Sequence, residues 1–369
     1  MTTGFVFHEL YMWHNTGNFA GVVPFGNPVQ PYEHADHPET KRRIKNLLDV
    51  SGLTKQLNRI EPREATDEEI LRFHTPGYLA KIASLNDQYA AEAGFFTPMG
   101  RGSFEIAKLS AGGVIEALDA VVANKVSNAY ALVRPPGHHA MPDMGMGSCI
   151  FGNAVIAGEH ALQARKLGKI ATVDWDVHHG NGTQAGFWEN PQALTISIHQ
   201  DAYFPDDTGT MSETGAGKGD GFNINVPLPP GSGVGAYEAV FERVVIPALA
   251  AFKPDLIIVP CGFDAGAWDP HGRQMMTSTG YRSLTRQLME VADDVCEGRI
   301  VMCHEGGYNG STVPFFGLAV LETLSGIDTH TEDPFDEMFN KFSGQDLQPH
   351  QDARVEEAQG LVANLVARC

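Results

Sequence analysis

Residues 170–178 read Ile-Ala-Thr-Val-Asp-Trp-Asp-Val-His and join a short apolar strand to a row of polar side chains. Other apolar runs end in the same abrupt way, in polar or glycine-rich sequence. The strands that we predict from these runs are 129–133, 170–173, 194–198, 256–259 and 300–303. Helical periodicity lies between or beside them, over 106–123, 154–166, 237–252, 281–295 and 313–324. Alternating strands and helices predict an α/β fold with a central parallel sheet flanked by helices.

The polar sequences that follow the predicted strands belong together in space. The carboxyl ends of parallel strands line one edge of a sheet, where ligands bind. These sequences are Arg134-Pro-Pro-Gly-His-His139, Asp174-Trp-Asp-Val-His178, His199-Gln-Asp201, Gly262-Phe-Asp264 and His304-Glu-Gly-Gly-Tyr308. A single polar residue at such a place often does no more than cap a strand. Several in one chain favour a common pocket, in which we expect all of these motifs to meet.

A metal site is predicted by the spacing of Asp174, Asp176 and His178. Alternate residues of an extended segment project from one face, so two carboxylates and an imidazole lie together. That set suits zinc, iron or manganese, and three protein ligands with an open fourth position are typical of a catalytic metal. Asp264 ends another strand and can add a carboxylate. We predict Asp176, His178 and Asp264 as the ligands, with Asp174 behind them.

Acid and base groups are predicted on two turns. His138 and His139 follow a rigid Pro-Pro-Gly turn, which leaves both rings little backbone freedom. One imidazole can take a proton from water while the other stays protonated beside a carboxylate, for which Asp174 is the candidate. Tyr308 follows a flexible Glu-Gly-Gly stretch and can donate to a carbonyl that is becoming an oxyanion. A pair of loop histidines and a packing tyrosine remain the plainer alternatives.

The composition excludes several classes of protein. The 369 residues are 43% hydrophobic and 19% charged, which is typical of a globular chain with a large core. A formal charge of -19 argues against a nucleic-acid surface and permits a cationic substrate. The five cysteines form no C-x-x-C pair, which predicts reduced thiols and a cytoplasmic protein. Residues 1–13 lack a secretory pattern and no run reaches the roughly 18 apolar residues of a membrane span, so we expect no membrane partner.

We predict a single domain over residues 1–369. Residues 1–100 read as its loop-rich N-terminal part, and 349–368 as an amphipathic C-terminal helix that packs on the body or meets a partner. The sequence contains no nucleophile elbow, P-loop, helical H-E-x-x-H or dinucleotide-binding glycine motif. Serine hydrolases, nucleotide hydrolases and dehydrogenases are therefore poor fits.

These motifs resemble those of the zinc-dependent histone deacetylases, most closely the class II type and the bacterial histone-deacetylase-like amidohydrolases. The resemblance extends from about residue 37 to residue 320, and includes Asn223-Ile-Asn-Val-Pro-Leu228 and the run from Asp174 to Thr183. It implies an arginase-like fold, with the active site at the carboxyl ends of the strands. Arginases bind two manganese ions with an acid two residues after the last ligand, where this chain has Gly266, so we expect one metal ion.

The resemblance also implies a role for each site residue. Asp176, His178 and Asp264 would bind one catalytic zinc ion, His139 would be the general base and acid, and Tyr308 would polarise the amide carbonyl. Asp174 would orient His138, and Asn181 would lie behind His139. A structural potassium ion is implied near the backbone carbonyls of Asp174, Asp176, His178 and Ile198 and the hydroxyl of Ser197. The expected reaction is zinc-dependent hydrolysis that removes an acyl group from a lysine side chain or a related small amide.

Two departures from the family concern the substrate. Gly147-Ser148-Cys149 stands where the family commonly has Gly-Phe-Cys, whose phenylalanine forms a wall of a narrow tunnel. We therefore expect Phe204 to be the only aromatic wall, and bulkier or more polar acyl groups to be tolerated. His271 stands where class II enzymes commonly have leucine and polyamine-selective members have glutamate. It is either a rim residue that shapes specificity or an exposed residue without a role.

Gly147, Ser148, Phe204 and His271 are thus the predicted substrate-binding residues. Two alternatives to a lysine deacylase stay open: an acetylpolyamine deacetylase, and a catalytically silent module that binds acylated amines. Related amidohydrolases often associate through the loops at the pocket rim, so we expect a homo-oligomer, either a dimer or a tetramer.

Overall fold

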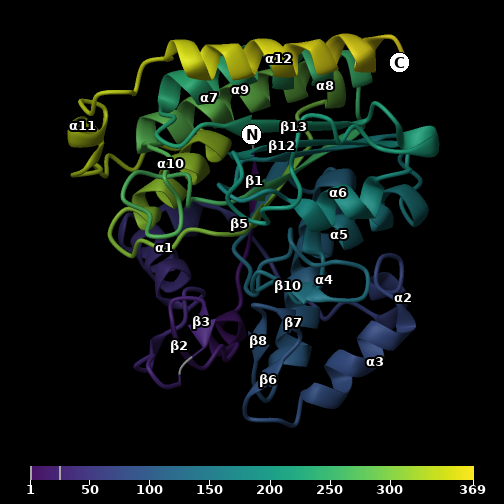
Figure 1. Ribbon diagram of the computed structural model, residues 1–369, viewed down its shortest axis with the longest axis vertical. Helices are drawn as coiled ribbons and strands as arrows, with labels where there is room; N and C mark the ends of the chain where they lie inside the picture. The colour runs from purple at the N-terminus through teal and green to yellow at the C-terminus, as the bar shows by residue number, and fades with distance from the viewer. Residues whose placement is uncertain (1, 25) are drawn as a thin grey trace.

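The computed structural model describes residues 2–24 and 26–369, and its centre is one large sheet (Figure 1). The strands are β1 (Thr3–Val6), β5 (Asn58–Ile60), β9 (Asn128–Ala131), β11 (Ile170–Asp174), β12 (Ala193–Gln200), β13 (Asn223–Leu228), β14 (Leu256–Cys261) and β15 (Ile300–His304). They lie in the order β13-β12-β11-β14-β15-β9-β1-β5, and every neighbouring pair is parallel. The predicted α/β fold with a parallel sheet is confirmed.

Helices cover both faces of this sheet (Figure 1). One face carries α4 (Ser103–Val122), α5 (Asn153–Gln163) and α6 (Asn181–Phe187). The other carries α1 (Glu39–Val50), α7 (Val234–Val240), α8 (Ile246–Phe252), α9 (Ser278–Cys296), α10 (Val313–Ser325) and α12 (Pro349–Val366). Within β14, Ile257 and Val259 enter one core while Leu256 and Ile258 enter the other. Both faces are buried, which is why the strands read as unbroken apolar runs.

The helix predicted over 237–252 is interrupted. Between α7 and α8 the chain forms a π-helical turn, Phe241–Val245. Pro247 lies in the first turn of α8, where it has no N–H to donate and its ring crowds the carbonyl four residues earlier. The α-helical bonding pattern therefore cannot continue through this point, and the wider turn accommodates the proline.

The N-terminal hundred residues hold more regular structure than the sequence indicated, since β1 and β5 join the central sheet. The other short elements are η1 (Glu9–Trp13), β2 (Asn18–Ala20), β3 (Val23–Pro24), β4 (Tyr32–Glu33), η2 (Leu53–Gln56), α2 (Asp67–Ile70), α3 (Pro76–Leu85), β6 (Ala91–Glu92), β7 (Gly94–Phe95), β8 (Pro98–Met99), β10 (Gly145–Met146), η3 (Gly217–Gly219) and α11 (Asp336–Phe339). At the other end, α12 packs against α7, α8 and β13. Among the described residues, no helix combines the length and the apolar character that crossing a membrane requires.

Candidate active site

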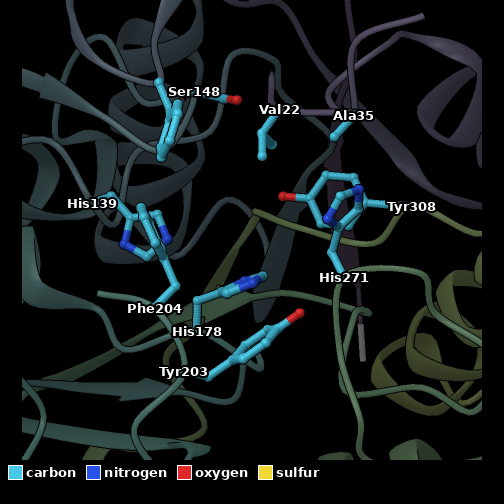
Figure 2. A pocket seen from close by; sticks show the side chains of 11 residues that line it. Val22, Ala35, His139, Ser148, His178, Tyr203, Phe204, His271 and Tyr308 are labelled. Carbon is cyan, nitrogen blue, oxygen red and sulfur yellow. The ribbon is translucent and has the colours of Figure 1, made fainter. Parts of the chain in front are cut away.

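A cavity of about 230 Å³ lies among the loops that follow the strands (Figure 2). Its lining residues are Val22, Ala35, Phe96, His139, Gly147, Ser148, His178, Tyr203, Phe204, His271 and Tyr308. His139 follows β9, His178 follows β11 and Tyr308 follows β15. The parallel sheet thus brings together side chains that are far apart in the sequence, at the edge where α/β proteins bind ligands. The four predicted substrate-binding residues, Gly147, Ser148, Phe204 and His271, all line this cavity.

One part of the predicted constellation is wrong, because His199 does not line the cavity. Strand β12 is longer than predicted and extends to Gln200, so His199 lies inside the strand, opposite Pro227 of β13. Its Nδ1 is 2.9 Å from Ser197 Oγ, and its Nε2 is 2.9 Å from the carbonyl of Gly209. The His199 motif therefore braces a loop, while the other four motifs converge.

Asp176, His178 and Asp264 form a compact group that could hold a metal ion. One potential ligand atom from each lies within 4.8 Å of the other two. Nδ1 of His178 is 3.0 Å from Oδ1 of Asp176 and 3.1 Å from Oδ2 of Asp264. All three side chains are buried. Two carboxylates removed from water in this way need a positive charge beside them.

Hydrogen bonds from backbone N–H groups orient the carboxylates of Asp176 and Asp264. Gly306 N donates to Oδ2 of Asp176 and Val177 N donates to Oδ1 of Asp264, each at 2.8 Å. Within the part of the chain that the structure describes, Oδ2 of Asp264 has Nδ1 of His178 3.1 Å away but accepts no hydrogen bond of regular geometry. Burial and the charge of Asp176 raise the pKa of Asp264 to about 6. The donor set therefore fits a divalent cation, which would supply the missing partner.

The two residues before Tyr308, Gly306 and Gly307, both have to be glycine. A Cβ on Gly306 would lie 2.1 Å from Oδ2 of Asp264, and Gly307 has a φ of +124°, where side chains are strained. Gly306 thereby lets the backbone approach the carboxylates closely, and its N–H is the donor to Asp176. The Glu-Gly-Gly-Tyr sequence thus serves both the metal group and the placing of the tyrosine.

The tandem histidines have different partners and opposite pKa shifts. His138 Nδ1 is 2.9 Å from Oδ2 of Asp174. Burial would lower the pKa of His138, but the charges of Asp176 and Asp174 outweigh it and raise the pKa to about 10. For His139, burial and the positive charge of His138 hold the pKa well below its usual value. One ring is therefore protonated and the other neutral at pH 7.

The partner of His139 decides which of its nitrogens is basic. Nδ1 of His139 is 2.8 Å from Oδ1 of Asn181, an atom that can only accept. The amide nitrogen of Asn181 is directed to the carbonyl of His139, which supports this orientation of the amide. Nδ1 therefore carries the proton, and Nε2 keeps the lone pair that a general base needs.

Tyr308 presents its hydroxyl to the cavity (Figure 2). Its main-chain N–H donates to Oδ2 of Asp269 at 2.8 Å, and its ring meets that of His271 edge to face at 4.9 Å. Burial raises the pKa of Tyr308 well above its usual value, so the phenol keeps its proton as a hydrogen-bond donor.

Sequence reasoning missed Glu305, although it stands in the motif that contains Tyr308. Its Oε2 accepts hydrogen bonds from the backbone N–H groups of Gly137 at 2.7 Å and His138 at 3.1 Å. The side chain is fully buried. Glu305 therefore ties the turn of the tandem histidines to the turn that carries the tyrosine.

The expectation of a single aromatic wall is also wrong. Phe96 and Tyr203 line the cavity together with Phe204. The ring of Tyr203 stacks on His178 with their centroids 5.6 Å apart. Tyr203 adjoins Phe204 in the sequence and was open to prediction. Phe96 was not, because it comes from the β7–β8 segment of the N-terminal part.

The structure is a parallel α/β fold with two carboxylates and an imidazole, a group that could hold a metal ion, at the carboxyl ends of its strands. Residues 34–324 match the histone deacetylase domain, and the chain belongs to the histone deacetylase family. It is 48% identical to a histone deacetylase-like amidohydrolase of Pseudomonas aeruginosa, over 90% of this chain and 88% of that protein. It is 34% identical to a probable deacetylase of Archaeoglobus fulgidus, over 89% and 88%.

The fold comparison agrees with these sequences. The crystal structure of the HDA15 HD domain superposes with a TM-score of 0.86 and 30% identity, covering 100% of this chain and 97% of that one. These relationships support a deacylase or amidohydrolase function for the chain.

Proposed function

We propose that the chain hydrolyses the amide of an acylated lysine side chain, or of a related small amide, with one zinc ion bound by Asp176, His178 and Asp264. The observation that carries this proposal is the placing of a neutral imidazole, His139, and a phenol, Tyr308, around one cavity with His178 of the metal group. A general base, an oxyanion donor and a metal group are what amide hydrolysis by water requires.

Each residue has a distinct task in this reaction. A bound zinc ion lowers the pKa of water toward about 7 and polarises carbonyl groups. His139 takes the proton of the attacking water at Nε2 and then gives it to the leaving amine. His138 stays protonated beside Asp174 and stabilises the negative charge that develops. The hydroxyl of Tyr308 donates to the carbonyl oxygen as that oxygen becomes negative.

The structure favours a single metal ion over a pair. A second ion of the arginase kind would need an acid at the position of Gly266. A Cβ there would lie 2.2 Å from Cε2 of Phe316, a ring in the hydrophobic core. No carboxylate fits in that space without a shift of the ring.

We also propose the structural potassium ion, held by the backbone carbonyls of Asp174, Asp176, His178 and Ile198 and by Ser197 Oγ. Asp174 pairs with Ser197 across β11 and β12, and a small interior cavity adjoins both residues. The hydroxyl of Ser197 lies 3.4 Å from the N–H of Gly180, just beyond the metal group. These contacts bring Asp174 and Ser197, two of the five proposed ligand residues, to one place and so support the proposal.

The lining of the cavity argues against a polyamine substrate. None of the eleven lining residues is a carboxylate that could pair with a second ammonium group. Burial lowers the pKa of His271 to about 4, so this ring is neutral at pH 7. An acyl-lysine stem, which is uncharged next to the amide, suits these walls better. A silent binding module would have no use for the basic Nε2 of His139.

The test is a panel of fluorogenic acyl-lysine peptides and acetylpolyamines, assayed with zinc-loaded and metal-stripped protein. We expect turnover of the acyl-lysine peptides that disappears on stripping and returns with about one equivalent of zinc, measured by mass spectrometry of the metal. Faster turnover of acetylpolyamines would contradict the substrate assignment. Zinc-loaded protein that turns over no member would contradict the proposed activity.

The pH profile of kcat/KM is expected to show an acid limb that lies below the ordinary range of a histidine. Only neutral His139 can accept a proton, and burial together with the charge of His138 lowers its pKa, so activity persists to lower pH than for an ordinary histidine. A bound divalent cation shifts this pKa in the same direction. The measurement is kcat/KM between about pH 5 and pH 9. An acid limb centred near the ordinary value of about 6.5 would contradict the assignment.

We further propose a cytoplasmic protein and a homo-oligomer of two or four chains. All five cysteines are free thiols, which suits a reducing compartment. Trp13, at the end of η1, and Tyr32, in β4, expose 68% and 71% of their surface, as residues at a subunit contact would in a single chain. Light scattering of the purified protein tests the association.

A further inference from the structure

The wall of the cavity contains a ladder between two distant segments. Strand β7 pairs in parallel with β10, with Gly94 opposite Gly145 and Phe95 opposite Met146. The pairing continues beyond the strands, since Gly147 N donates to the carbonyl of Phe95 and Ser148 N donates to that of Phe96, both at 2.9 Å. Phe96 and Ser148 are therefore fixed as neighbours, and both line the cavity.

Both of these neighbours adopt an uncommon backbone conformation. Phe96 has a φ of +52° and Ser148 a φ of +68°. A bulky residue rarely adopts such values, and strain of this kind concentrates at functional sites. The turn is held by hydrogen bonds from Ala93 N to the carbonyl of Thr97 at 2.9 Å and from Thr97 N to Oε1 of Glu92 at 2.5 Å. These hydrogen bonds close the turn around Phe96 and hold its backbone in this conformation.

The segment places one ring in the lining of the cavity and leaves the preceding ring half-exposed. Phe96 lines the cavity, while Phe95 is 48% exposed. The ring of Phe95 lies against Phe96 with a centroid separation of 4.2 Å and is nearly parallel to Phe204 at 6.4 Å. The rings of Phe95, Phe96 and Phe204 therefore form an aromatic cluster between two segments that are distant in the sequence.

The turn that carries Ser148 lies close to the proposed catalytic groups at Gly147. A Cβ on Gly147 would lie 2.5 Å from Cδ2 of His139 and 3.0 Å from Cε1 of Phe204. Ser148 is small, its N–H donates to the carbonyl of Phe96, and both residues line the cavity. A ring at position 148 would compete with the ring of Phe96 for one volume, because interiors are closely packed.

We infer that Phe96 is the aromatic wall that works with Phe204, and that Ser148 is small because Phe96 occupies the space beside it. The inference rests on the proposed function and specifies its substrate: the two rings clasp an unbranched, uncharged methylene stem of the lysine type. The channel is consequently narrow in spite of Ser148. Selectivity for the stem depends on a residue outside the segments that carry the catalytic groups.

A double-mutant cycle tests this inference. Phe96→Ala is expected to lower kcat/KM for a fluorogenic acetyl-lysine peptide by about tenfold, mostly through KM, because apolar contact with the stem is lost. Ser148→Phe is expected to cause a similar or larger loss, because two rings then compete. The double variant Phe96→Ala/Ser148→Phe is expected to recover to within about threefold of the original protein, because one ring again fills the wall. Tyr89→Ala removes an 80% exposed ring from the same segment, and we expect it to change kcat/KM by less than about twofold.

Two further measurements keep the outcome decisive. The same cycle is read as the Kd of an unlabelled acetyl-lysine peptide in a Tyr308→Phe background, which requires no turnover. The thermal midpoint of Ser148→Phe shows whether this variant folds. If it does not fold, the inference is tested by comparing Phe96→Leu with Phe96→Ala. A loss that grows from leucine to alanine supports the wall.

The results that overturn the inference differ from those that overturn the proposed function. Phe96→Ala within about twofold of the original protein in both kcat/KM and Kd overturns the inference alone. So does a folded double variant that is no better than Ser148→Phe. Zinc-loaded protein that binds the peptide without turnover contradicts the proposed function, and a Kd weakened about tenfold by Phe96→Ala still supports the wall. Absence of both binding and turnover overturns both.

Discussion

Tyr308→Phe is expected to lower kcat by about 10²- to 10³-fold, while Kd for an acetyl-lysine peptide changes only a few-fold. The variant keeps the ring, its edge-to-face contact with His271 and the main-chain bond to Asp269. Only the hydroxyl is lost. A donor that strengthens as the carbonyl oxygen becomes negative contributes to kcat far more than to ground-state binding.

The measurement combines kcat with Kd and with the zinc content of the variant. Tyr203→Phe is the matched control, since Tyr203 lines the same cavity through a ring stacked on His178. We expect it to lose less than about threefold in kcat. Equal losses in the two variants, or loss of zinc from Tyr308→Phe, would contradict the role of the Tyr308 hydroxyl.

Asp264→Asn is expected to abolish stable metal binding and to lower kcat/KM by about 10³-fold or more. Oδ2 of Asp264 is a buried oxygen of the metal group that accepts no hydrogen bond of regular geometry from the described residues, so the proposed metal is its expected partner. The neutral amide keeps the shape of the side chain but is a much weaker ligand. The primary measurement is the metal content per chain after dialysis.

Thermal unfolding gives a readout for Asp264→Asn that needs no activity. Added zinc should raise the Tm of the original protein, because a ligand that binds only the folded state stabilises it. It should leave the Tm of Asp264→Asn nearly unchanged. Without metal the variant should be at least as stable as the original, since one of two neighbouring buried carboxylates is neutralised.

Asp255→Asn provides the matched control, because Asp255 precedes β14 just as Asp264 follows it. Its carboxylate accepts from the N–H groups of Gly168 and Lys169, away from the metal group. We expect full metal content and a normal zinc-induced rise in Tm. A variant of Asp264 that keeps both properties would falsify the ligand assignment.

Most residues of the candidate site could be predicted from the sequence, because they follow from local patterns of residue spacing. Asp176 and His178 share a face through the two-residue repeat of extended backbone. Their convergence with Asp264 and Tyr308 follows from a parallel sheet, whose strands all end at one edge. The prediction failed for His199 because β12 extends further than its apolar run, and strand ends are the least certain part of such patterns.

Two features of the structure were not predicted from the sequence: the interruption of the helix before α8, and the hydrogen bonds of Glu305. Pro247 was visible in the sequence, but its consequence depended on a helix that packing maintains on both sides of the proline. Glu305 could be seen in its motif. The two N–H groups that donate to its carboxylate, those of Gly137 and His138, follow a different strand. Hydrogen bonds of this kind require the two turns to be brought together first.

The sequence by itself determined the parallel α/β fold and singled out side chains that meet at one edge of the sheet, because both depend on spacings of a few residues and on the common direction of the strands. The tertiary structure alone decided how strongly and in which direction the pKa of each tandem histidine shifts, and that Phe96 stands beside Ser148. The first depends on which buried charges surround each ring, and the second on a ladder between β7 and β10. Neither burial nor long-range register is encoded in a short stretch of residues, since both arise only when distant segments pack.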